Sequence, residues 1–569
     1  MSNIASWVGS VTRSSADKAR RALRWLVLFL LVLFGGVILS GCGGGGSNGN
    51  GGGNTCTVTG VSVSASPSSL SVNASSTLTA TVNATSTCSQ AVTWSASPAG
   101  GTLTPNGGSA TFTSGTAGTY TITATSSADG SKAGSASVIV NPVATACGTP
   151  NGTVVTHSAN ISADETWAGD GVTHHVLNSI GISGAATVTV QPCAIVAMGP
   201  GATITVTNTA KLVAAGTSST SFVVFERADV NQAWGILRGA SETSLIELHW
   251  TVLQGAGAFG GQYNNPAIAA VGPGYFVPPA AVLKVDNVFI QSPQGTGVYF
   301  DANAAFTADS QALTITGAST YPLVTNMMAL GSIPTGSYTG NADDEINVIG
   351  PSVNVFGDLT IHDRGVPVRI QTGGFTVAPS GGATAPVTLT VEPGVTIKFP
   401  KANATTPGAR VIFGTNGNSP NNLVGVLNAV GTAAKPIVFT SGEAAPAPGD
   451  WVGLVLDTAT GSKLDYVEIS YAGAPSGFVS ANCRPLNTPD TAALIIGDFD
   501  TQYVPPADLI TNSVISNSAG FGIDAIWRAP AYNGPDLTAS NVFQNNARCA
   551  QTFNSPTQGV CPANGCTAN

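Results

Sequence analysis

Short runs in which apolar and polar residues alternate recur along most of this 569-residue chain. In one of them, the period of two places Val467, Ile469 and Tyr471 on one face, while the residues between them face water. Leu464 turns inward just before this run. Two further runs follow the same pattern: Phe222–Phe225 and Ile437–Phe439. Because turn residues separate the runs and Val and Thr are frequent within them, we predict an all-β chain.

Six segments of the first half recur, in the same order, in the second half. The aligned pairs are Gly171–Val176 with Gly365–Ile370, Ala186–Pro192 with Val387–Pro393, Leu212–Thr217 with Leu427–Thr432, Trp234 with Trp451, Leu245–Val252 with Leu464–Tyr471, and Asn287–Val298 with Asn512–Ile523. The offset between aligned residues grows from 194 to 225 and never decreases, as surface insertions in the second copy would produce. We therefore predict a tandem duplication. In this alignment Trp250 takes the place of Ile469, which predicts a core position for Trp250 rather than a sugar-binding platform.

Strands recur about every 20 to 25 residues, which is the repeat length expected of a solenoid. The motifs that carry a more specific resemblance are Val391–Phe399, Gly431–Ser441, Asp450–Leu454, Asn512–Asn517, Gly520–Ile523, Asn287–Ile290 and Asn541–Asn546. Over residues 160–560 the chain resembles right-handed parallel β-helix proteins. Asn at the turns is physically sensible, since it tolerates positive φ. Because each coil needs a covered end, residues 147–185 are expected to cap one end of a domain spanning 147–569, and the tail 549–566 the other.

The segment 57–142 shows a different spacing of short alternating runs and turns, which is typical of a β-sandwich. Its motifs are Ser66–Leu70, Val92–Trp94 and Ala117–Ala124. On these residues the segment is similar to bacterial Ig-like domains of the group 2 kind. That resemblance implies a spacer or an adhesive module at a bacterial surface.

The first residues have the order of an export signal. Arg20, Arg21 and Arg24 precede an apolar run, which ends in Leu39-Ser-Gly-Cys42. This order resembles the bacterial lipoprotein signal, and it implies a signal peptide over 1–41 and lipidation of Cys42. An uncleaved membrane helix is the alternative.

The Gly-rich stretch 42–56 is expected to be a flexible tether. From the signal, Cys42 and the tether together, we expect a lipid-anchored protein of the bacterial outer membrane or cell surface.

Only 9% of the residues are charged, whereas 43% are hydrophobic, which excludes a disordered chain. Loss of the signal peptide removes five basic residues and Asp17, leaving 15 Lys and Arg against 28 Asp and Glu, a net charge of −13. This balance disfavours nucleic acid as a partner.

Nine cysteines, less Cys42, leave an even number, which indicates disulfides and an oxidising compartment. Proximity along the chain suggests the pairs Cys56–Cys88, Cys147–Cys193, Cys483–Cys549 and Cys561–Cys566. A zinc site is the competing interpretation, but no CxxC pair occurs.

The parallel β-helix proteins that the chain resembles include pectate lyases and polygalacturonases. The residues that these enzymes need for catalysis can therefore be sought in this sequence. Hydrolases of this kind need paired carboxylates and a Gly-His-Gly element, and no His here lies between glycines. Lyases need Ca²⁺-binding carboxylates and a base, for which few Lys and Arg are present. No nucleophile elbow or nucleotide fingerprint occurs, and no cofactor is implied.

Three clusters nevertheless merit attention. The weak metal candidates are the carboxylates Asp343, Asp344 and Glu345, which could bind Ca²⁺ in the connection between the copies. The weak catalytic candidates are His362, Asp363 and Arg364, since a carboxylate beside an imidazole can orient an acid or base. His174 and His175 could pair on a metal, but alternation along a half-buried strand explains them equally.

The sequence predicts an envelope protein that adheres to, or binds, a glycan or a surface protein along its β-helix. A diverged polysaccharide lyase or glycoside hydrolase is the alternative, and a purely structural envelope protein is the third. An enzyme should bring two or more carboxylates and a basic residue to one substrate position.

Overall fold

The computed structural model describes residues 56–71, 74–85, 88–116, 118–141, 147, 150–350, 355–371, 373–380, 382–402, 408–414, 423–457, 460–477, 490–497, 505–526 and 535–552. Within these residues the chain is almost entirely strand, as predicted, with two short 3₁₀ helices, η1 (Gln262–Asn264) and η2 (Met327–Ser332). No helix among the described residues has the length and apolar character needed to cross a bilayer.

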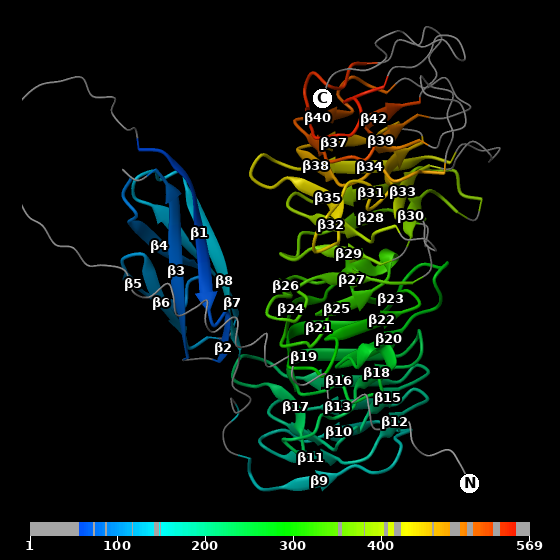
Figure 1. Cartoon of the computed structure of the whole chain (residues 1–569). Helices are drawn as coiled ribbons and strands as arrows, with labels where there is room; N and C mark the ends of the chain where they lie inside the picture. The colour runs from blue at the N-terminus through cyan, green and yellow to red at the C-terminus, as the bar shows by residue number, and fades with distance from the viewer. Residues whose placement is uncertain are drawn as a thin grey trace, which may run out of the picture. The chain divides into compact units, whose positions relative to one another are not determined.

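Two four-stranded sheets form the first part of the described chain (Figure 1). One contains β1 (Val58–Ser66), β3 (Ser75–Ala84), β6 (Ser109–Ser114) and β5 (Gly101–Asn106), and the other β2 (Ser69–Ser71), β8 (Ala133–Asn141), β7 (Gly118–Ser126) and β4 (Val92–Ser97). Their inner residues share one core, which includes Leu78, Phe112, Tyr120 and Val138. The predicted sandwich is therefore present.

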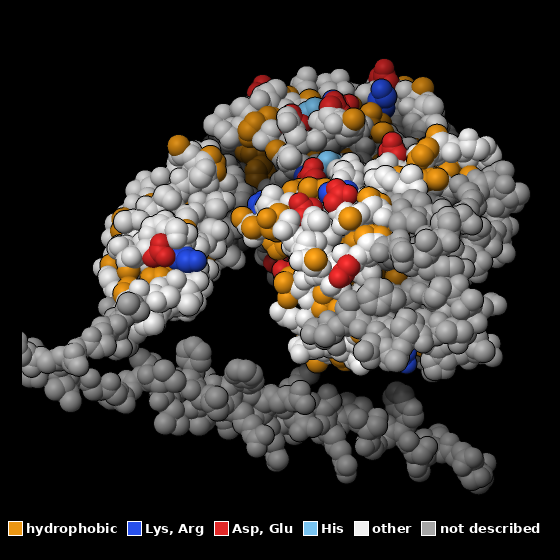
Figure 2. All heavy atoms as spheres, turned by 90° about the horizontal axis from the view of Figure 1, so that it is seen from above, with side chains coloured by type: hydrophobic (Ala, Val, Ile, Leu, Met, Phe, Trp, Pro, Cys, Tyr) orange, Lys and Arg blue, Asp and Glu red, His pale blue; other side chains and the backbone are white. Residues whose placement is uncertain are grey.

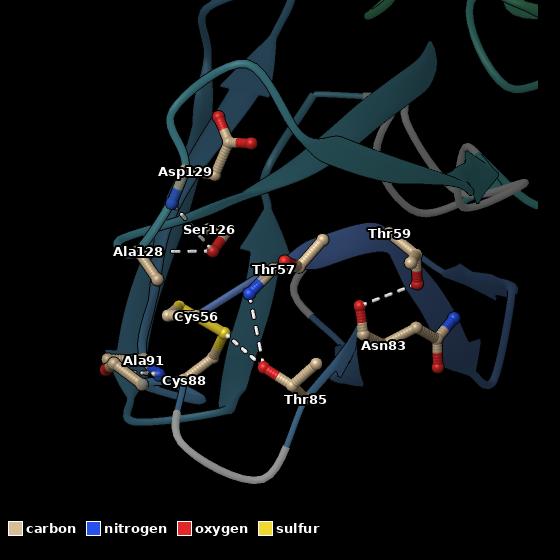
Figure 3. Close-up of a disulfide and its surroundings, with 11 residues drawn as sticks. Cys56, Thr57, Thr59, Asn83, Thr85, Cys88, Ala91, Ser126, Ala128 and Asp129 are labelled. Carbon is tan, nitrogen blue, oxygen red and sulfur yellow. Dashed lines mark hydrogen bonds between the residues drawn. A yellow bond between two sulfur atoms is a disulfide. The ribbon is translucent and has the colours of Figure 1, made fainter. Parts of the chain in front are cut away.

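A disulfide between Cys56 and Cys88 ties the start of β1 to the loop after β3 (Figure 3). Thr85 supports it, because its hydroxyl accepts a hydrogen bond from the Thr57 N–H at 3.1 Å and lies 3.4 Å from the Cys88 sulfur. A second disulfide joins Cys147 and Cys193. Both pairings match the prediction, and they indicate an oxidising compartment.

The rest of the described chain coils into stacked parallel strands (Figure 1). A twelve-stranded sheet holds β9 (Val154–Thr156), β10 (Glu165–Trp167), β11 (Thr173–Val176), β13 (Thr187–Val190), β14 (Ile195–Met198), β16 (Lys211–Ala215), β17 (Val223–Arg227), β19 (Leu245–Gln254), β21 (Ala280–Gln291), β23 (Ala304–Phe306), β24 (Gln311–Thr316) and β26 (Gly336–Ser337). In each coil of this first block, a first strand (as β16) and a second strand (as β17) lie on this sheet. The long strands β19 and β21 each supply both.

A thirteen-stranded sheet runs through the whole coil. Its members are β12 (Ile180–Ile182), β15 (Ile204–Val206), β18 (Leu237–Gly239), β20 (Ile268–Val271), β22 (Val298–Asp301), β25 (Leu323–Thr325), β27 (Ile346–Val348), β29 (Val368–Ile370), β32 (Thr396–Phe399), β35 (Ile437–Ser441), β38 (Val467–Ser470), β41 (Val514–Ser516) and β43 (Val542–Gln544). All of its neighbours pair in parallel, one coil apart.

Two five-stranded sheets complete the second block. One contains β28 (Leu359–Ile361), β31 (Val387–Val391), β34 (Gly425–Val430), β37 (Lys463–Asp465) and β40 (Ile510–Thr511), and the other β30 (Gly374–Val377), β33 (Arg410–Phe413), β36 (Gly453–Leu456), β39 (Ala492–Ile496) and β42 (Phe521–Ala525). Stacked parallel strands on successive coils are the architecture of a parallel β-helix.

A single cluster of buried side chains runs from Ile161 to Leu537 and so passes through both blocks. It consists almost wholly of Val, Ile, Leu, Ala and Phe from alternate strand positions, as the period of two predicts. Each fully buried Val, Leu or Ile contributes about 1.5–3 kcal/mol relative to an exposed one. The coil therefore depends on neighbours above and below for its stability.

At the junction of the two blocks, the strand of each coil that belongs to the thirteen-stranded sheet changes. In the first block, the thirteen-stranded sheet takes the third strand of each coil, up to β27. In the second block, it takes the second strand, beginning with β29. Since Ile346 lies opposite Val368 across this step, the second block is turned by one face relative to the first.

Matching positions of the two blocks nonetheless keep the same local structure. The indole N–H of Trp234 donates to the Gln254 carbonyl at 2.8 Å, and that of Trp451 donates to the Ser470 carbonyl at 2.9 Å. Both rings are fully buried. The tight bends between first and second strands fall at aligned Asn residues, Asn287 (φ 56°) and Asn512 (φ 50°), which supports the role predicted for Asn at turns.

Three predicted core positions differ in the structure. Trp250 lies at a positive-φ bend (39°) in the middle of β19, half-buried, and packs outside the coil against Phe222 and Phe289. The prediction that Trp250 lies in the coil core is therefore wrong. The bend at Tyr466 (φ 49°) is its counterpart, so the alignment was displaced by three residues in this stretch.

Tyr471 also has positive φ (60°), which ends the alternation of β38, so it does not share the inward face of Val467 and Ile469. Phe222 is buried in the outer cluster with Trp250, not in the core of the coil. In each case a bend that the period of two cannot foresee redirects the side chain.

Candidate functional site

A groove lies where the first block ends and the second begins. We call it the junction groove. It has a volume of about 650 Å³ and is lined by Pro279, Ala281, Ala305, Phe306, Ala308, Ser310, Met328, Gly331, Ser332, Ile333, Pro334, Thr335, Asp358, Leu359, Thr360, His362 and Arg364. These residues come from β21, β23, η2 and β28 and from the segments that adjoin them. Because β28 is the end strand of its sheet and packs against η2 rather than a strand, the groove is a product of the turn between the blocks.

One wall of the junction groove is built by β28 and its flanking residues. Alternation buries Leu359 and Ile361 in the core. It leaves Asp358, Thr360 and His362 outward, about 6.6 Å apart at each step of two residues. A carboxylate, a hydroxyl and an imidazole thus form a row along a single strand. Groups in such a row can hydrogen-bond successive units of an elongated ligand.

The imidazole of His362 is oriented by a carboxylate from the next coil. Its Nδ1 lies 2.7 Å from Oε1 of Glu392, whose Oε2 accepts the N–H of Asp363 at 3.0 Å. Burial raises the pKa of Glu392, but the hydrogen bonds from His362 and Asp363 outweigh it, so this pKa lies below its ordinary value. An ionised Glu392 is only an acceptor, so Nδ1 carries a proton. In the neutral ring, Nε2 is then free to accept a proton or a hydrogen bond.

Two neighbours of His362 that the sequence proposed as catalytic have structural partners. Oδ2 of Asp363 receives Lys435 Nζ at 3.0 Å. Arg364 donates from Nε and Nη2 to the Ile333 carbonyl, at 3.0 and 2.7 Å, and so ties the second block to the first. The structure brings His362 and Arg364 to one groove and directs Asp363 toward Lys435.

The acidic run 343–345 separates into different roles. Glu345 pairs with both Arg369 and Lys398, the latter at 2.7 Å. Asp344 accepts N–H groups from the turn before it, at residues 340 and 341, and Asp343 is exposed. No group of three His, Cys, Asp or Glu that could hold a metal ion occurs among the described residues.

The two neighbouring histidines point to opposite faces of β11. His174 is almost fully buried, with Nε2 2.9 Å from the Ala168 carbonyl and Nδ1 2.9 Å from Nε2 of His157. His175 is half-buried on the outer face. Trp167 stacks on His157 with ring centroids 4.0 Å apart. These three rings close the first end of the coil core.

Sequence reasoning missed Asp358, Thr360 and Glu392 at the junction groove. Glu392 follows His362 by 30 residues, which is the coil length that separates the paired residues Ile361 and Val391. A stacking alignment with that coil length could have found it. Coil length varies along the chain, however: Ile469 and Ile515 are also paired and are 46 residues apart.

A ladder of charged side chains on and beside the first strands of the first block was also missed. Glu247, His249, Lys284, Asp286 and Asp309 contact one another across three coils, at 2.8 to 3.5 Å. Figure 2 likewise shows groups in which acidic and basic side chains adjoin, together with acidic side chains that stand apart from any basic one. Part of the exposed charge is thus compensated within the protein.

Several predicted sites fall beyond the described residues. Cys42, the signal peptide 1–41 and most of the tether 42–56 do so, as do Cys483, Cys561 and Cys566. Cys549 is described and is disulfide-bonded.

No protein-family profile matches the chain, and neither a curated protein nor a solved structure matches it.

Proposed function

We propose that this protein is exported, anchored by lipid at Cys42 to the bacterial outer membrane or cell surface, and binds a glycan or a surface protein through its β-helix. The junction groove carries the proposal. It is a concave site of the size that ligands occupy, with a row of hydrogen-bonding groups on one wall. Two disulfides support export to an oxidising compartment.

The other parts of the chain fit this role as supports. We propose that the sandwich over 57–142 is an Ig-like spacer between the lipid anchor and the β-helix, on the strength of its sequence motifs. We also propose the right-handed form of the β-helix, since parallel crossover connections are right-handed in about 98% of cases.

Binding to a glycan array and to surface-protein extracts of the source cell tests the proposal. Wild-type protein is expected to retain a ligand from one of these two classes. His362→Ala, which removes the oriented imidazole from the groove wall, is expected to weaken retention at least about tenfold. His175→Ala is the matched control, because His175 is a half-buried strand histidine away from the groove. Equal loss in both variants, or retention of neither ligand class, would reject the groove as the site.

An enzyme acting on polysaccharide is the second candidate, and the His362–Glu392 pair favours it. A carboxylate that orients an imidazole is the arrangement of a general base. The groove lining offers one carboxylate, Asp358, which lies about four residues of strand, or about 13 Å, from His362. The lining thus supplies one carboxylate, whereas most glycosidases use a pair that flanks the scissile bond. If the wild type releases new sugar ends and Asp363→Ala or His362→Ala abolishes that release, the protein is an enzyme rather than a binding protein.

A further inference from the structure

The loop that follows β20 presents an aromatic side chain beside the junction groove. Phe276 is 72% exposed, and Val277 next to it is 40% exposed. Pro279, three residues on, lines the groove, so the Cα of Phe276 lies at most about 11 Å from it. A ring exposed to this extent contributes little to the core and is accessible to a ligand.

This loop is held in place by its own hydrogen bonds. The N–H of Gly274 donates to the Ala302 carbonyl at 3.0 Å, and the side chain of the buried Asn303 donates to the Val277 carbonyl at 2.8 Å. The Tyr275 hydroxyl donates to Asp301. Phe276 is therefore presented from a fixed backbone, and a ligand that covers it orders little more than one side chain.

The charged groups around the groove carry a net negative formal charge. Asp363 is paired with Lys435, and the guanidinium of Arg364, which donates to the neutral Ile333 carbonyl, is a single positive charge beside the two carboxylates of Asp358 and Glu392. Asp358 accepts the N–H of Thr388 and has no ion-pair partner among the described residues. With a neutral His362 imidazole the excess is one negative charge, and the chain as a whole is acidic. Both features repel a polyanion.

The remaining polar groups suit hydroxyl groups. Asp358 is an acceptor, Thr360 is donor and acceptor, and His362 Nε2 takes either role according to its protonation. Repeated hydroxyls on a chain can hydrogen-bond this row, while the C–H face of a ring packs on Phe276 and buries apolar area.

We infer that the junction groove binds an uncharged, hydroxyl-rich chain of rings, that is, a neutral polysaccharide, with Phe276 as its stacking platform. This inference rests on the proposed function and narrows its ligand class. It excludes acidic polysaccharides, and it assigns Phe276 a role in binding.

Affinity electrophoresis of the full chain in gels that contain one soluble polysaccharide provides the test. The neutral probes are a β-glucan, a mannan and a xylan, and the acidic probes are polygalacturonate and alginate. Retardation is expected with at least one neutral probe and with neither acidic one. Phe276→Ala is expected to weaken that retardation about tenfold or more, and Asp358→Asn several-fold. Val230→Ala is the matched control, since Val230 is 77% exposed on another loop and should leave binding unchanged.

The outcomes separate this inference from the proposed function. Retardation by an acidic probe that His362→Ala abolishes would overturn the inference and leave the groove as a binding site. Retardation by a neutral probe that Phe276→Ala leaves intact would remove the stacking platform. No retardation by any probe overturns the inference, and the proposed function then depends on binding of a surface protein. Equal thermal unfolding midpoints of Phe276→Ala and wild type confirm that the variant is folded.

Discussion

One turn of the first block, residues 191–194, has a counterpart in the second block, residues 392–395. Each of them follows the first strand of its coil. In both turns Pro is the second residue and the fourth N–H bonds back to the first carbonyl: Ala194 to Gln191 at 3.2 Å and Val395 to Glu392 at 3.3 Å. The third residue has positive φ in both. It is Gly394 in the second block, where such a φ is unstrained, but Cys193 in the first.

The difference shows how the two blocks hold one geometry by different means. Glycine reaches the left-handed region freely, whereas a residue with a Cβ does so at a cost of about 1–3 kcal/mol. Cys193 is bonded to Cys147, which ties the chain before the first coil to this turn. The first block thus has a cross-linked residue at the position where the second block has a glycine. Each prediction below tests how far such equivalence extends.

The largest effect is expected at the paired tryptophans. Trp234→Ala and Trp451→Ala should each lower the free energy of unfolding by about 3–5 kcal/mol, because both rings are fully buried. Equilibrium urea unfolding measures this. Trp451→Phe keeps the ring that stacks on Phe399 but loses the N–H bond to Ser470, so a smaller cost of about 1–3 kcal/mol is expected. A cost for Trp234→Ala below that of Trp451→Phe would break the equivalence of the two positions.

Removal of the Cys147–Cys193 disulfide is expected to have the next largest effect. The pair Cys147→Ala with Cys193→Ala should lower the free energy of unfolding by about 2–4 kcal/mol. Replacing Cys193 by Gly instead should recover about 1 kcal/mol, since Gly relieves the positive φ of 68°. Urea midpoints of the two double variants measure the difference. Identical midpoints would show that the positive φ of residue 193 has no cost that glycine relieves.

A smaller effect is expected at the ion pairs that join the blocks. Burial raises the pKa of Glu345, but hydrogen bonds from Arg369 and Lys398 outweigh it, so its pKa lies below the ordinary 4.5. Its contribution is therefore complete above pH 4.5 and is lost as pH falls through the folded-state pKa. Glu345→Gln should cost about 1–3 kcal/mol at pH 7 and flatten the dependence on acid.

The exposed Glu468 provides the control for this variant. Glu468→Gln should change neither the stability at pH 7 nor its acid dependence, as measured by thermal unfolding between pH 7 and 3. If Glu345→Gln behaves in the same way, the junction does not depend on these ion pairs.

The histidines at the first end of the coil should make that end sensitive to acid. Burial lowers the pKa of His157 and His174 below 6.5. The unfolded state therefore protonates first as pH falls below 6.5, and stability is lost toward the folded-state pKa values. Glu165, 3.8 Å from His157, opposes this in part. Amide exchange in β9 and β11 should accelerate by about three- to tenfold between pH 7 and 5, beyond the intrinsic rate.

The control for the acid response is the outward neighbour His175. His175→Gln should keep the acceleration, whereas His157→Gln combined with His174→Gln should remove it. Acceleration that survives the double variant would assign the effect to other groups.

The smallest effect is expected at the tight bends of the first block. Trp250, Asn287 and Ala312 stack in register at one bend, with φ of 39°, 56° and 52°. Ala312→Asn or Ala312→Gly should raise the free energy of unfolding by about 0.5–1 kcal/mol, because Asn and Gly accept positive φ. Asn287→Ala should lower it by a similar amount. Urea midpoints that fail to move in opposite directions would contradict this account.

The sequence by itself determined the local plan of the molecule. Alternation identified the inward side chains of most strands, such as Val467 and Ile469, because the period of two follows from backbone geometry alone. Asn287 and Asn512 marked bends, because few residues accept positive φ. Cysteines close in sequence identified the two disulfides that the structure describes. The predicted directions of the Trp250 and Tyr471 side chains were wrong, because a bend reverses the direction of a side chain without changing the alternation of residue types.

Only the tertiary structure decided how the blocks join. The inward residues of all the sheets are the same Val, Ile and Leu types, so any face of one block can stack on any face of the next. The chosen turn by one face places β28 at a sheet end beside η2 and opens the junction groove. It also brings Glu345 to Lys398, 53 residues away. Stacking of consecutive coils within the second block brings His362 to Glu392. Such pairings depend on coil lengths, which are set by loops and leave no periodic trace in the sequence.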